Sequence, residues 1–149
     1  MYVHPITTLL LMSIALLCSS CYEKADSAKT TNYKNLHLEK ANFQGQRLEE
    51  ANFSGAHLNS ANFSYANIDK AYFIKADLTN SNITFAKSEH VNFEEANLTD
   101  ADLSHGNFSY SYFEKAQLSN VKAESANFQG AKGLSNETIA NLKRSGAIF

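Results

Sequence analysis

The chain has 149 residues, of which 44% are hydrophobic and 19% charged, with no Trp, one Pro and six Gly. This composition fits one folded domain and argues against a disordered chain. With a formal net charge of −2 the chain lacks the basic excess that drives phosphate binding, so we expect no nucleic-acid partner. Its two cysteines lie near the N-terminus, so they cannot form a disulfide framework for the rest of the chain.

An apolar run from Ile6 to Cys18 comes first and is followed by a polar stretch. The run is shorter than the roughly 20 residues that a membrane-spanning helix needs. Its length matches the hydrophobic region of a secretion signal, and the small residues Ser19 and Ser20 precede the expected cut. We therefore predict a signal peptide over residues 1–20 and an exported protein.

The segment from Leu16 to Cys21 resembles a bacterial lipoprotein signal, in which a cysteine becomes the lipidated first residue of the mature chain. It departs from that pattern because Cys18 stands where Leu is usual, and because only the α-amino group and His4 precede the apolar run. The resemblance implies acylation of Cys21 and anchoring in the bacterial cell envelope, facing the periplasm or the cell surface. Ordinary cleavage, an uncleaved anchor and absence of export are the alternatives. Residues 21–32 have the composition of a lipidated cysteine followed by a flexible tether.

The next hundred residues follow a period of five. Of the 19 positions reached from 38 in steps of five, 17 carry a bulky apolar side chain, and 15 of the 19 positions two residues earlier carry Ala, Ser or Gly. A helix repeats every 3.6 residues and a strand every 2.0, so neither keeps this pattern in register. Each five-residue segment must therefore form one side of a larger coil.

Identical core residues recur at every fourth step of this series, which predicts four sides to a coil. Like side chains stacked one coil apart would fill a narrow interior without voids. Two series show this recurrence: Leu38, Leu58, Leu78, Leu98 and Leu118, and Phe53, Phe73, Phe93 and Phe113.

The five-residue pieces look like units of the pentapeptide-repeat family, Ala-Asn/Asp-Leu/Phe-x-x, as in residues 41–45, 51–55 and 96–100. The resemblance implies an all-β fold, a right-handed quadrilateral β-helix of about five coils over residues 33–132. Such a solenoid needs protected ends. Exposed strand edges at an end would also permit a homodimer.

The repeat pattern is broken at two places, at Ser88 and after residue 132. Ser88 replaces a bulky core residue, so we expect a local rearrangement over residues 87–90, either a tolerated defect or a functional bulge. Residues 133–149 lose the period, and Ser135 as an N-cap with Gly146 as a stop predicts a short capping helix over the last coil.

A search for chemistry finds no catalytic, cofactor or metal motif. None of the five histidines has a partner at His-x-x-x-His spacing, and Gly-rich phosphate loops and Gly-x-Ser-x-Gly elbows are missing. We therefore expect no cofactor and no enzymatic activity.

Stacking at a separation of 20 predicts which outward side chains share a column. One column combines exposed aromatic groups, which can mark an interaction face, and another is acidic and suits a cation or a basic partner, although a solvated acidic edge explains it as well. Lys75, Glu95 and Lys115 form a third column of ordinary surface pairs. The candidate interaction face combines the first two columns: Tyr65, Phe85 and His105, with Glu49, Asp69 and Glu89.

The sequence thus favours a membrane-anchored, non-catalytic interaction or structural module of the cell envelope, with a protein partner that the residues do not identify. The family resemblance offers one alternative, a DNA mimic acting on DNA gyrase or another topoisomerase. The repeat region has only a mild acidic excess, and export would separate the protein from gyrase, so this alternative is the weaker one.

Overall fold

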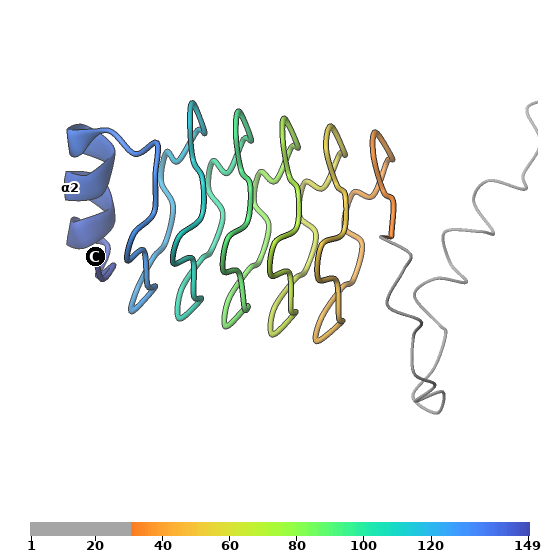
Figure 1. The fold of residues 1–149 in the computed structure, drawn as a ribbon, viewed down its shortest axis with the longest axis horizontal. Helices are drawn as coiled ribbons and strands as arrows, with labels where there is room; N and C mark the ends of the chain where they lie inside the picture. Colours follow the sequence, from red (N-terminus) through yellow and green to blue (C-terminus); the bar gives the residue numbers. More distant parts are fainter. Residues whose placement is uncertain (1–30) are drawn as a thin grey trace, which may run out of the picture.

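The computed structural model describes residues 31–149. The predicted signal peptide, Cys21 and nearly all of the predicted tether lie outside the described residues. The described chain winds into a rod of stacked coils, with a helix at the end that contains the C-terminus (Figure 1).

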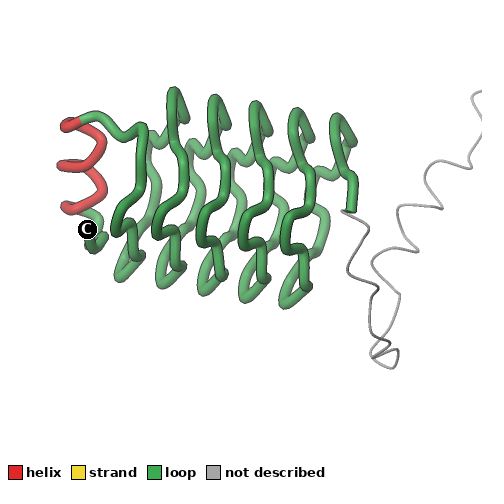
Figure 2. Tube along the Cα trace, viewed as in Figure 1, coloured by secondary structure: helices red, strands yellow, loops and turns green. Residues whose placement is uncertain are grey.

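Parallel bridges join each coil to the next. Nearly every bridge links residues 20 apart, as in His57↔Asp77 and Asp77↔Asn97, so each coil contains four five-residue segments. The bridges are isolated contacts of single residues, and the rod is coloured as loops and turns (Figure 2). The first bridge involves Asn32, one residue before the predicted start of the solenoid.

A tight turn forms each corner. In the first turn the N–H of Leu36 donates to the carbonyl of Tyr33 at 3.2 Å, and the same bond recurs at each five-residue step through most of the rod. The residue before each donor has a positive φ, 57° at Asn35 and 59° at Lys40, as the third residue of a type II turn requires. Most of these corner residues are not glycine, and none is β-branched.

The Asn or Asp that precedes most core residues has a structural role. Its Oδ1 accepts the N–H two residues further on, as at Asn62, which accepts from Ser64 at 3.0 Å, and Asp77, which accepts from Thr79 at 3.1 Å. This local bond holds the outer backbone of the segment where the chain bends. This hydrogen bond explains why the repeat has Asn or Asp directly before the core residue.

Stacked side chains fill the interior, as the recurrence of like residues one coil apart predicts. The rings of Phe53 and Phe73 stack at 4.9 Å between centroids, and those of Phe73 and Phe93 at 5.3 Å. Neighbouring columns meet edge to face, as Phe53 and Phe63 do at 5.5 Å and 89°. Tyr33 begins the Phe53 column, and burial raises the pKa of its hydroxyl.

The predicted rearrangement at Ser88 is present. The turn that should join the N–H of Val91 to the carbonyl of Ser88 is opened, and the hydroxyl of Ser111 stands between them. It accepts from Val91 N–H at 3.0 Å and donates to the Ser88 carbonyl at 2.7 Å. The hydroxyls of Ser81 and Ser88 are buried without a hydrogen-bond partner.

Helix α2, Asn136–Arg144, covers the last coil (Figure 1). Ser135 is its N-cap and accepts from Thr138 N–H at 3.1 Å, and Leu142 is buried against the rod. The chain then returns to the rod, where Ile148 bridges to Asn127 and the ring of Phe149 stacks on Phe128 at 5.5 Å. The predicted cap is thus confirmed, and the last residues add part of a further coil to it. Within residues 31–149 there is no helix both long and apolar enough to cross a membrane.

Candidate functional site

Three aromatic side chains form a continuous outward stack at one corner of the rod, which we call the aromatic corner: Tyr65, Phe85 and His105. The rings of Tyr65 and Phe85 are 4.9 Å apart and nearly parallel, and those of Phe85 and His105 are 4.6 Å apart. Tyr65 is 60% exposed and Phe85 is 46% exposed. The structure therefore brings together the aromatic part of the predicted face.

A second aromatic stack lies at the next corner along the chain. His90 and Tyr110 stack at 5.3 Å, and Tyr110 is also exposed. Segments 86–90 and 106–110 run from one aromatic stack to the other, so aromatic rings border one side of the rod at both edges. Sequence reasoning missed His90 and Tyr110, although their spacing, that of one full coil, was the signal.

The acidic column, Glu49, Asp69 and Glu89, lies on this same side and forms hydrogen bonds within the rod. Glu49 accepts from the amide of Asn67 at 2.8 Å, and Glu89 accepts from the amide of Asn107. The Asp69 carboxylate accepts the N–H of Glu89 at 2.9 Å. These bonds tie successive coils together, which gives the three carboxylates a structural explanation.

Ordinary surface pairs account for the third predicted column. Glu95 lies 3.6 Å from the Lys75 ammonium and 4.0 Å from that of Lys115. All three side chains are well exposed, and such pairs contribute only a few tenths of a kcal/mol. The predicted pairing is present.

A cluster of metal-ligating side chains lies on another side, in the first two coils, and we call it the histidine cluster: His37, Glu39 and His57. The two imidazole rings stack at 4.5 Å and 4°. Nδ1 of His37 lies 3.0 Å from Oε1 of Glu39, and this hydrogen bond, with one from the backbone of Glu39 itself, lowers the pKa of the carboxyl. A search based on helical histidine spacing misses this pair, because the winding of the rod places equivalent residues of successive coils side by side.

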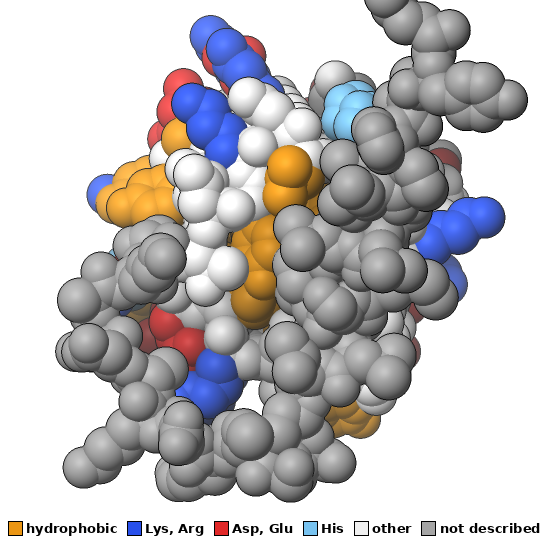
Figure 3. Space-filling model, turned by 90° about the vertical axis from the view of Figure 1, so that its right-hand side faces the viewer, with side chains coloured by type: hydrophobic (Ala, Val, Ile, Leu, Met, Phe, Trp, Pro, Cys, Tyr) orange, Lys and Arg blue, Asp and Glu red, His pale blue; other side chains and the backbone are white. Residues whose placement is uncertain are grey.

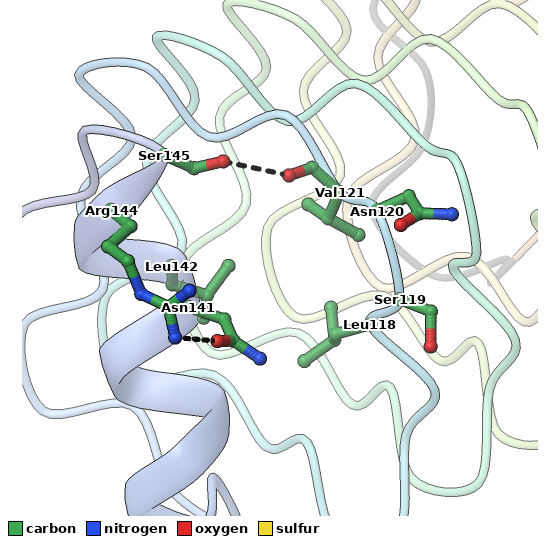
Figure 4. A pocket seen from close by; sticks show the side chains of 8 residues that line it. All are labelled: Leu118, Ser119, Asn120, Val121, Asn141, Leu142, Arg144 and Ser145. Carbon is green, nitrogen blue, oxygen red and sulfur yellow. Dashed lines mark hydrogen bonds between the residues drawn. The ribbon is translucent and has the colours of Figure 1, made fainter.

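A hollow of about 440 Å³ separates the last coil from α2. Leu118, Ser119 and Val121 line it from the rod, and Asn141 and Arg144 from the helix (Figure 4). The hydroxyl of Ser145 donates to the carbonyl of Val121 at 3.1 Å and closes one edge. Arg144 is the one titratable side chain among the residues that line the hollow, and we assign the hollow no chemistry.

The opposite end of the rod is where the described chain begins. Figure 3 looks onto this end, where hydrophobic side chains are visible near the centre and Lys and Arg side chains project from the rim. Tyr33, Leu38 and Phe43 of the first coil are slightly more exposed than the core residues of the middle coils.

Comparison with known families assigns nearly all of the repeat region. A family profile described as a pentapeptide repeat region matches residues 27–103, and one described as pentapeptide repeats in eight copies matches residues 96–132. A search of curated proteins finds no match.

Among solved structures, a pentapeptide repeat protein from the thylakoid lumen of Arabidopsis thaliana is 24% identical, with a TM-score of 0.73 over 77% of this chain and 81% of that one. This likeness shows the fold, a right-handed β-helix. A pentapeptide repeat protein from the cyanobacterium Cyanothece 51142 is 23% identical over 72% of this chain and 63% of that one, with a TM-score of 0.38. QnrB1, a plasmid-mediated fluoroquinolone resistance protein, is 16% identical over 81% of this chain and 75% of that one, with a TM-score of 0.33.

Proposed function

Because the chain belongs to the pentapeptide-repeat family, whose matches span residues 27–132, we propose that it is a non-catalytic interaction module, lipid-anchored at Cys21 in the bacterial cell envelope. In this proposal the rod displays the aromatic-bordered side to a protein partner. The aromatic corner is the observation that carries the proposal.

The aromatic corner combines a disfavoured backbone conformation with exposed aromatic side chains. A bulky side chain at positive φ costs about 1–2 kcal/mol relative to right-handed backbone. Phe85 has a φ of 57° and still leaves almost half of its surface in water. Contact with a partner would bury this apolar surface, and aromatic residues are enriched where proteins bind one another.

The acidic column contributes less to the proposal, because hydrogen bonds between coils already explain its carboxylates. The rings at the two borders would supply apolar contact. Between them, the exposed side chain of Lys87 is available for a hydrogen bond with the partner. Three to five rings make a small contact area, which suits a transient interface.

The proposed anchor rests on the sequence from Leu16 to Cys21. Several acyl chains on one cysteine would hold the rod at a membrane, since each buried methylene contributes about 0.8 kcal/mol. Fractionation of the native producer tests this: the natural chain should sediment with membranes, and a Cys21→Ala chain should retain its signal peptide or become soluble.

A Cys18→Ala chain is the matched control and should behave as the natural one. Mass spectrometry of the mature N-terminus should find acyl groups on Cys21. Equal, fully soluble distributions of the natural and Cys21→Ala chains would overturn the anchor.

The partner face is tested by photo-crosslinking in intact cells. A crosslinking amino acid at position 85 should capture one defined protein, and the same group at Asn80, an exposed corner residue on another edge with φ 56°, should not. Capture from both positions alike, or from neither, would overturn the face. Capture of a cytoplasmic topoisomerase would favour the DNA-mimic alternative.

A further inference from the structure

The histidine cluster lies on a part of the surface that the proposed partner face does not use. His37 and His57 occupy equivalent places in successive coils, and the bridge between them sets their register. The N–H of His57 donates to the Leu36 carbonyl at 2.9 Å, and the N–H of Leu38 donates to the His57 carbonyl at 2.8 Å. The backbone therefore holds the two imidazoles side by side on a rigid support.

From this arrangement we infer that His37, Glu39 and His57 form a binding site for a borderline divalent transition-metal ion, with Zn²⁺ as the best match. One ligand atom from each residue lies within 4.8 Å of the others. Nδ1 of His37 and Oε1 of Glu39 are already 3.0 Å apart. Two ligand atoms bonded to one tetrahedral Zn²⁺ at about 2.0–2.1 Å lie roughly 3.3 Å apart. Side-chain rotations alone can therefore bring all three ligands to one ion.

The donor set selects the kind of ion. Two imidazole nitrogens and one carboxylate oxygen suit Zn²⁺, and also Ni²⁺ and Cu²⁺, whereas Ca²⁺ and Mg²⁺ require more oxygen ligands than this cluster offers. The three side chains are exposed, so a fourth position is open to water or to an external ligand.

The two histidines also depart from the structural pattern of the repeat. At most equivalent places an Asn or Asp accepts the N–H two residues further on, as Asn42 does from Gln44 at 3.1 Å. His37 and His57 do not make this bond. The side chain of Glu39, two residues after His37, turns instead toward the imidazole. In two adjacent coils, therefore, the side chain at this position does not accept the usual backbone N–H, and the two imidazoles lie together as possible ligands.

Zn²⁺ titration of the full chain tests the inference. Cys18 and Cys21 are replaced by Ser in every sample, so that thiols do not bind the ion, and a chromophoric chelator reports competition. We expect one Zn²⁺ per chain. His37→Ala and His57→Ala should each weaken binding by more than about tenfold, and Glu39→Gln by a smaller factor, because the remaining imidazoles still bind the ion.

His90→Ala is the matched control, since His90 is an exposed histidine outside the cluster, and it should bind as the reference does. Circular dichroism establishes that each variant remains folded. Millimolar Mg²⁺ should not displace Zn²⁺. The site is overturned if the reference chain binds no Zn²⁺, if the His37 and His57 variants bind as tightly as the reference, or if His90→Ala weakens binding equally. Because all samples share the same cysteine replacements and the titration uses the purified chain without a partner, each of these results is independent of the anchor and of the partner face.

Discussion

Two buried serines in the same part of the core have opposite hydrogen-bonding situations. The Ser111 hydroxyl joins the N–H of Val91 to the carbonyl of Ser88, whereas the Ser88 hydroxyl has no partner. A buried polar group without a partner costs about 1–3 kcal/mol, so the two hydroxyls should differ in their effect on the free energy of unfolding.

We therefore predict that Ser111→Ala lowers the free energy of unfolding by about 1–3 kcal/mol, because it leaves one donor and one acceptor unpaired. Ser88→Ala should leave stability unchanged or raise it slightly. Urea denaturation of both variants measures the difference. A Ser111→Ala chain as stable as the natural one would show that the N–H of Val91 and the carbonyl of Ser88 find other partners.

The corner residues show strain that glycine would relieve. Lys40 has a φ of 59°, and Gly45, one segment later, has a φ of 66°. A side chain disfavours this region, although glycine also increases the entropy of the unfolded chain. We expect Lys40→Gly to raise the free energy of unfolding by about 0.5–1 kcal/mol.

The reciprocal change, Gly45→Ala, should lower stability by a similar amount, because an added Cβ meets no atom within 4 Å and only the backbone conformation opposes it. Thermal unfolding of the two variants, measured side by side, checks the sign of both effects. A lower free energy of unfolding for Lys40→Gly and a higher one for Gly45→Ala would mean that the corner conformation relaxes on substitution.

At the scale of the single element, α2 protects the end of the rod through one buried side chain. Leu142 is 2% exposed, whereas Ala140 of the same helix is exposed. A charge at position 142 would have to leave the contact with the last coil, and the open edges of that coil would then be free to pair with another chain.

Leu142→Asp should accordingly give oligomers whose size increases with concentration, and Ala140→Asp should keep the mass of the natural chain. Light scattering during gel filtration measures both. A Leu142→Asp chain with the natural mass at every concentration would show that α2 is not needed to protect this end.

A five-residue side requires a small residue where the backbone turns inward. Ala61 is fully buried, and the neighbouring columns leave no room for a longer side chain. Ala61→Leu should lower the free energy of unfolding by about 3 kcal/mol or more, while Gln44→Leu, at an exposed outward place, should change it by less than about 0.5 kcal/mol. Chemical denaturation distinguishes the two.

The coils could be predicted from the sequence, because stacking of one coil on the next requires a period of five and the recurrence of Leu and Phe at every fourth segment. The cap helix could also be predicted, because Ser135 suits an N-cap and Gly146 suits a helix stop. The opened turn at Val91 could not be predicted in detail, because it depends on the hydroxyl of Ser111 in the next coil. The histidine cluster could have been found, had the spacing of one coil been applied to histidines as it was to the aromatic residues.

At the scale of the whole molecule, each coil contacts only the coils before and after it. The middle coils have two neighbours, whereas the first coil has only one among the described residues, and its core residues are slightly exposed. Local opening should therefore begin in the first coil and not in the middle.

Hydrogen exchange should show this gradient in the amide protons of the core residues. We expect Leu38 and Phe43 to exchange faster than Leu78 and Ile83, which hold equivalent places two coils further on. Uniform protection along the rod would indicate a single cooperative unit.

Because every column runs parallel to the axis, the chain tolerates gain or loss of whole coils in a way that few domains do. Duplication of the stretch that forms one coil would extend the rod by about 4.8 Å and leave all four sides facing as before. Insertion of a single repeat unit would instead rotate everything that follows by a quarter turn and divide the aromatic corner between two sides. Changes in length during evolution should therefore occur in steps of a whole coil wherever a surface column has been selected.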